Sequence, residues 1–198
     1  MEGAKKRLVP ILIAVLFIAA LVGLVFYVES RPTNYEKSFY EGMPYGEVSC
    51  VIAERFLNGY VSEYEYLVFA EGNLLCMMDP SPAHFELLNE VVDIILGDET
   101  IQISFRENTD RSAFFKGAAA KSYQISTEGY YKDGKISKEV YDLIMEKYDE
   151  LIASPSNERM EEFSDIVNTY LDGIQDMPLL EGASSLAARS FNKFIIIF

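Results

Sequence analysis

The sequence predicts an α+β protein in which a single N-terminal transmembrane helix precedes a helix-rich extracytoplasmic domain with a small antiparallel sheet. Three observations predict this class. Residues 8–28 carry no charge, residues 60–78 combine aromatic and β-branched residues around a turn-like segment, and residues 137–176 repeat apolar residues at helical spacing.

The uncharged segment 8–28 follows Lys5-Lys6-Arg7 directly. At 1.5 Å rise per residue a helix over this segment is roughly 32 Å long, which matches a hydrocarbon core of about 30 Å. We therefore predict a single-pass anchor with the lipid bilayer as its partner. A cleaved secretory signal peptide is the alternative, although its apolar stretch is normally shorter.

Cationic residues on the two sides of this segment predict its orientation. Three precede it, whereas Arg31 and Lys37 follow it among acidic residues. The positive-inside rule therefore places residues 1–7 in the cytoplasm and residues 29–198 outside the cell membrane. We expect residues 29–41 to form a tether and residues 42–198 to form the ectodomain.

The composition is strongly acidic. The chain has 17 Lys and Arg residues against 31 Asp and Glu residues, which gives a formal net charge of −14. Phosphate groups repel such a domain, so nucleic-acid binding is excluded as a main function. A protein partner is expected to be basic or apolar, although the charge could also serve solubility alone.

The first half of the ectodomain is expected to hold a helix and a β-hairpin. Pro44 suits a first helical position, the apolar stripe through Val48 and Ile52 follows, and Gly59 ends the helix. Cys50 falls opposite that stripe, which argues against a disulfide with Cys76. Two strands over 60–69 and 74–78, joined by turn residues 70–73, are expected next.

The second half is expected to be mainly helical. Ser81 and Pro82 open a helix that Gly97 ends, and a strand over 101–105, a helix over 109–121 and a strand over 123–126 follow. Residues 137–176 are expected to form a helical hairpin because their connection at 154–157 is short. The apolar residues 194–198 are expected to be an added strand, a partner-binding segment or the cut edge of a longer chain.

Residues with catalytic or ligand chemistry are sparse, and we assign no catalytic, cofactor-binding or metal-binding residue. The one histidine, His84, falls in the first turn of a helix and reads as a cap-region residue. The carboxylates within 142–150 and 161–165 read as solvated helix faces or as a weak cation site. Tyr60, Tyr64 and Tyr66 are the candidate partner contacts, because alternating tyrosines make a rigid contact surface.

One segment resembles a known family. Gly42-Met43, Val48, the helix end at Gly59 and the later Gly72-Asn73-Leu74 resemble the SmpA/OmlA-like and beta-lactamase-inhibitor-like envelope modules. The resemblance covers residues 41–78, with Pro44 where that family favours Thr. It implies helices packed on an antiparallel sheet and a protein-interaction role in the cell envelope.

These observations predict a membrane-anchored extracytoplasmic interaction or accessory module without catalytic activity. One alternative is a membrane-tethered hydrolase whose polar active site carries no sequence motif. Another is a regulatory subunit whose transmembrane helix binds a partner helix.

Overall fold

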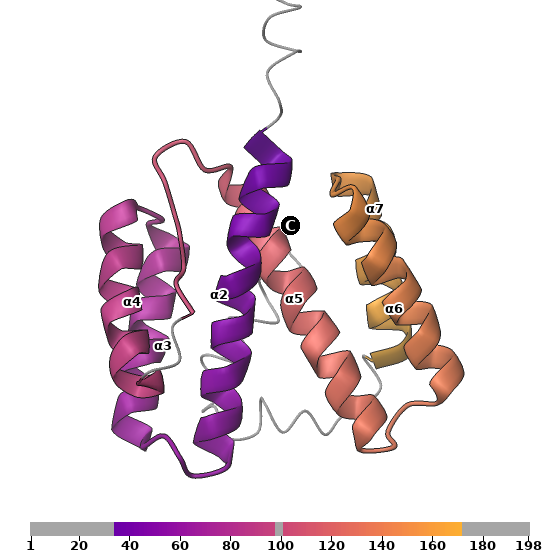
Figure 1. Ribbon diagram of the computed structural model, residues 1–198, viewed down its shortest axis with the longest axis horizontal. Helices are drawn as coiled ribbons and strands as arrows, with labels where there is room; N and C mark the ends of the chain where they lie inside the picture. Colours follow the sequence, from indigo (N-terminus) through magenta and orange to yellow (C-terminus); the bar gives the residue numbers. More distant parts are fainter. Residues whose placement is uncertain (1–33, 98–100, 172–198) are drawn as a thin grey trace, which may run out of the picture. The chain divides into compact units, whose positions relative to one another are not determined.

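The computed structural model describes residues 34–97 and 101–171, which belong, except for Asn34, to one compact unit spanning Tyr35–Phe198. The described residues form six α-helices: α2 (Asn34–Leu57), α3 (Glu63–Met78), α4 (Pro82–Leu96), α5 (Arg111–Lys132), α6 (Lys138–Ala153) and α7 (Asn157–Leu171) (Figure 1).

These helices form two structural repeats offset by 75 residues. In each repeat a long helix of 24 or 22 residues is followed by a hairpin of a 16-residue and a 15-residue helix. The loop after each long helix turns at a glycine with positive φ, Gly59 or Gly134, and ends at a serine N-cap, Ser62 or Ser137. Because L-residues avoid positive φ, glycine suits this turn in both repeats.

The core positions of the two repeats keep the same 75-residue offset. A stacked aromatic pair joins the long helix to the next helix in each repeat, Phe56 with Tyr66 and Tyr131 with Tyr141. The final helices bury equivalent residues: Phe85, Leu88, Val92 and Leu96 in α4, and Met160, Phe163, Val167 and Leu171 in α7. The described chain is therefore one three-helix architecture built twice.

The two long helices α2 and α5 lie side by side between the two hairpins (Figure 1), and their backbones meet at glycines. A Cβ atom added at Gly42 would lie 1.8 Å from the Phe114 carbonyl oxygen, and one added at Gly117 would lie 1.8 Å from the Phe39 carbonyl oxygen. Gly46 meets Ala118 in the same way, at 2.1 Å. This contact is reciprocal, and it requires residues without side chains where the two backbones meet.

The crossing also exchanges one phenylalanine between the two cores. Phe39 of α2 is fully buried in the core that α5, α6 and α7 form, whereas its equivalent, Phe114 of α5, is fully buried in the core of the first repeat. Each ring packs with the hairpin of the other repeat, so apolar burial links the two repeats.

One side-chain amide makes a pair of hydrogen bonds with the connection between the repeats. The Asn89 amide nitrogen donates to the Ile103 carbonyl at 2.8 Å, and the Asn89 oxygen accepts from the Ile103 N–H at 2.9 Å. Burial alternates along this segment: Ile103 and Phe105 are buried, and Gln102 and Ser104 are exposed. An asparagine side chain thus supplies the two hydrogen bonds that a neighbouring strand would give.

The predicted α+β class is wrong, because residues 34–97 and 101–171 contain helices and no strand. Residues 63–78, predicted as part of a β-hairpin, form the single helix α3. Its start is a capping box, in which the Ser62 hydroxyl accepts from the Glu65 N–H and the Glu65 carboxylate accepts from the Ser62 N–H. These two hydrogen bonds satisfy amides that a helix start otherwise leaves free.

Other expectations are corrected in the same way. The segment 123–126 lies inside α5 rather than in a strand, and 101–105 alternates in burial without a strand partner among the described residues. Helix α2 covers Asn34–Leu57 and holds Pro44 in its interior, so it overlaps the expected tether at 29–41 and Pro44 is not its first residue. Helices α6 and α7 lie within the span 137–176, and the helix predicted after Ser81 is confirmed as α4.

Among the helices of the described segments, none has both the length and the apolar character that a bilayer crossing requires. The predicted span 8–28, and the apolar end 194–198, lie outside the described residues.

Candidate functional site

The most distinctive surface of the described chain is an apolar stripe on α3, which Tyr60 extends in the loop just before that helix. Its residues are exposed and large: Tyr60 at 82%, Tyr64 at 77%, Leu67 at 48%, Leu74 at 45% and Met78 at 77%. We call these five residues the outer stripe. From Tyr64 onwards its members, with Glu71 between the two leucines, recur at spacings of three and four residues, so they share one helix face.

The opposite face of α3 packs on the core and fixes the direction of the stripe. Phe69 and Cys76 are the buried residues of this helix. The half-buried Tyr66 lies against Phe56, with ring centroids 4.2 Å apart and planes 15° apart. Because these residues turn inward, a helix with 3.6 residues per turn must turn Leu67 and Leu74 outward.

The outer stripe begins beside a well-defined helix end, the capping box of Ser62 and Glu65. Hydrogen bonds from the Ser62 hydroxyl and, second, from the Ser62 amide to the Glu65 carboxylate lower the pKa of that carboxyl below its usual value. The carboxylate is therefore charged at neutral pH, at the end of the helix where the backbone dipole favours negative charge.

The second repeat shows that the fold does not need an apolar stripe at this place. The equivalent face of α6 is exposed too, but its residues are charged or small. In the order of the outer stripe they are Lys135, Glu139, Asp142, Asp149 and Ala153, with Glu146 in place of Glu71. The same helix position on the same architecture is thus apolar in one repeat and polar in the other.

The first hairpin, which carries the outer stripe, is rich in acidic residues. Between residues 60 and 97 the chain holds no Lys or Arg and seven acidic residues: Glu63, Glu65, Glu71, Asp79, Glu86, Glu90 and Asp93. The first hairpin therefore presents an apolar strip within a negatively charged field.

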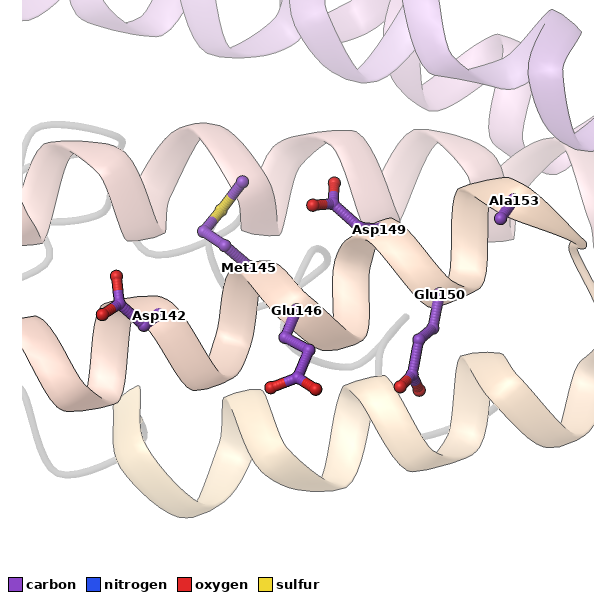
Figure 2. A pocket seen from close by; sticks show the side chains of 6 residues that line it. All are labelled: Asp142, Met145, Glu146, Asp149, Glu150 and Ala153. Atoms are coloured by element: carbon purple, nitrogen blue, oxygen red, sulfur yellow. The ribbon is translucent and has the colours of Figure 1, made fainter.

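The face of α6 is the second surface with concentrated functional groups. A shallow depression of about 610 Å³ is lined by Asp142, Met145, Glu146, Asp149, Glu150 and Ala153. Figure 2 shows that these carboxylates do not converge, since Asp149 points to one side of the helix and Glu150 to the other. Lys138 pairs with Asp142 and Lys147 with Glu150. Within the described residues, no group of three or more His, Cys, Asp or Glu side chains is arranged to hold a metal ion.

The three tyrosines predicted as partner contacts fall into two groups. Tyr60 and Tyr64 are exposed in the outer stripe, whereas Tyr66 faces inward against Phe56. In the predicted strands Leu67, Leu74 and Met78 were not candidate contacts, whereas in α3 they share a helix face with Tyr64. The helical spacing after the Ser62-x-x-Glu65 cap was the signal that could have found them.

The two cysteines are buried, and the histidine lies at a helix start. Cys50 and Cys76 are buried free thiols, so the expectation that Cys50 faces away from the core is wrong. Burial raises the pKa of Cys76 to about 12. His84 lies in the cap region, where its Nδ1 is 2.6 Å from the Asp79 carbonyl oxygen. Arg159, at the equivalent position, donates to the Ser154 carbonyl.

No protein-family model matches this chain, and comparisons with curated proteins and with solved structures found no match. The outer stripe is therefore the feature of the described residues that bears most directly on function.

Proposed function

We propose that this protein is a protein-interaction module and that its partner binds the outer stripe of α3. The observation that supports this most is the difference between the two repeats. Both α3 and α6 show this face to solvent, and only α3 fills it with large apolar side chains. Contiguous exposed apolar side chains are typical of interaction surfaces, since their burial in a complex is favourable.

The composition of the stripe supports a protein as the partner. Tyrosine and methionine are enriched at protein interfaces, and leucine side chains give apolar area at the centre of a contact. The seven carboxylates of the first hairpin repel phosphate groups, so anionic lipid and nucleic acid are poor partners for this face.

Site-specific photocrosslinking in intact cells tests the proposal. A photoreactive amino acid is placed at Leu67 on α3, and in a matched variant at Asp142, the equivalent position on α6. We expect a discrete adduct of higher mass from position 67 and none from position 142. Adding Leu74→Asp, which introduces the residue that α6 carries at this place, should remove the adduct. Equal crosslinking from both positions, or none from position 67, would contradict the proposal.

A further inference from the structure

We infer that the segment bound at the outer stripe is a basic amphipathic helix that lies along α3. This inference rests on the proposed function and names the chemistry of the partner. Two properties of the first hairpin carry it, the helical spacing of the apolar residues and the sign of the surrounding charge.

The spacing favours a helix as the bound element. One face of α3 has exposed residues at alternating intervals of three and four, which is the pattern of a coiled-coil seam. These residues are Tyr64, Leu67, Glu71, Leu74 and Met78. At 1.5 Å rise per residue the span from 64 to 78 is about 21 Å, which is the length of a helix of about 15 residues. A partner helix with apolar residues at the same spacing can place its side chains between those of α3.

The charge specifies the rest of the partner. Glu71 is exposed in the middle of the stripe, between Leu67 and Leu74, so any helix on this face must lie beside its carboxylate. With no Lys or Arg in residues 60–97, the hairpin itself offers no basic residue for this carboxylate. A lysine or arginine in the partner would be favourable there, and an acidic residue would be repelled.

The same charge argues against a second copy of this chain as the occupant. Two outer stripes in contact would bring their Glu71 carboxylates close together, on hairpins that each carry seven acidic residues and no Lys or Arg. Like charges at an interface are unfavourable. An acidic or neutral helix lacks the complementary charge as well, which leaves a basic amphipathic helix.

A labelled peptide tests the inference with the full-length chain. The probe is a designed helix of about 18 residues with leucines at heptad a and d positions and lysines on both sides, and two further probes replace every lysine by glutamine or by glutamate. Fluorescence anisotropy should show that the lysine peptide binds about tenfold or more tightly than the glutamine peptide, that added salt reduces this difference, and that the glutamate peptide binds weakest.

Matched variants locate the binding. Leu67→Asp together with Leu74→Asp introduces the residues that α6 carries at these positions, so the fold should remain, which far-UV circular dichroism checks. This variant should weaken binding of the lysine peptide by about tenfold or more. Glu71→Lys should weaken it similarly, whereas Glu146→Lys, the same exchange at the equivalent position of α6, should leave it within about twofold.

The outcomes separate this inference from the proposed function. If the glutamine peptide binds as tightly as the lysine peptide and Leu67→Asp/Leu74→Asp removes both, the interaction role holds and the basic partner is wrong. If sedimentation shows a dimer that this variant dissociates, the occupant is a second copy, and the inference is overturned. If Glu146→Lys weakens binding as much as Glu71→Lys, the attraction is not specific to α3, and the inference fails.

Discussion

The crossing of α2 and α5 gives the sharpest prediction for the fold, through the variant Gly117→Ala. The new Cβ would lie 1.8 Å from the Phe39 carbonyl oxygen and 2.7 Å from the carbonyl carbon, whereas ordinary contact begins at 3.4 Å. The two backbones must separate by about 1.6 Å along this direction, because a main-chain carbonyl cannot rotate away as a side chain can. Separation also loosens the contacts at Gly42 and Gly46.

Overpacking a close contact costs about 1–3 kcal/mol and occasionally more, and this contact involves backbone on both sides. We expect Gly117→Ala to lower the free energy of unfolding by about 3 kcal/mol, which for a chain of this size lowers Tm by about 6–12 °C. Denaturant unfolding followed by circular dichroism measures the free energy directly.

Gly129→Ala is the matched control, since Gly129 lies in the same helix and a Cβ added there meets no atom within 4 Å. Alanine favours the helix over glycine by about 0.5–1 kcal/mol, so this variant should be more stable than the parent. If the two variants unfold at the same denaturant concentration, the close approach of α2 and α5 is not what holds the repeats together, and our account of the fold is wrong.

Two further predictions concern the exchanged phenylalanines and the buried titratable groups. Phe39→Ala and Phe114→Ala should each cost about 3–5 kcal/mol in denaturant unfolding, because each fully buried ring leaves a cavity in the core of the other repeat; a loss under about 1 kcal/mol for either would argue against the exchange. Burial raises the pKa values of Tyr35, Tyr148 and Cys76 to about 12, from 10.0 for the tyrosines and 9.0 for the cysteine. The unfolded chain therefore loses these protons at a lower pH than the folded chain does. This contribution to stability should be fully present below pH 9 and should fall as the pH rises from 9 towards 12. A Tm that stays constant between pH 9 and 12 would contradict this.

The misassigned helix α3 shows why local pattern was insufficient. Residues 60–69 are rich in aromatic and β-branched residues, which favour strands, and Gly72-Asn73 is typical of turns. The structure has a helix because the Ser62–Glu65 cap starts it and because Phe69 and Cys76 pack against the first core. Gly72 lies in the interior of this helix, where an added Cβ atom would lie 3.1 Å from the Leu88 side chain of α4. Tertiary packing thus outweighs strand propensity here.

The segment 101–105 shows the opposite case, in which the burial pattern was predicted and its partner was not. The alternation of apolar and polar residues correctly indicated that Ile103 and Phe105 are buried. The hydrogen-bond partner, however, is the side chain of Asn89, fourteen residues earlier. Periodicity reports which side of a segment is buried, and it carries no information on what covers it.

The duplication was present in the sequence and was missed there. Three pairs of identical residues at helix ends are 75 positions apart in the sequence. They are Gly59 with Gly134, Ser62 with Ser137, and Ser81 with Ser156. Few core residues are identical between the repeats, since Phe85 corresponds to Met160 and Leu88 to Phe163. Apolar residues of similar size replace one another in a core while the pattern is kept, so the repeat is evident in burial before it is evident in residue identity.

The sequence by itself determined the features that neighbouring residues control. The start of α4 at Ser81-Pro82, the buried side of that helix at Leu88 and Val92, and the acidic character of the first hairpin all follow from caps, periodicity and composition. Only the tertiary structure decided that α2 and α5 meet backbone to backbone at Gly42 and Gly117, and that the outer stripe of α3 faces solvent. The physical reason is that a close approach and an exposed face are both set by residues that are distant in the chain, and local sequence does not encode the distance between them.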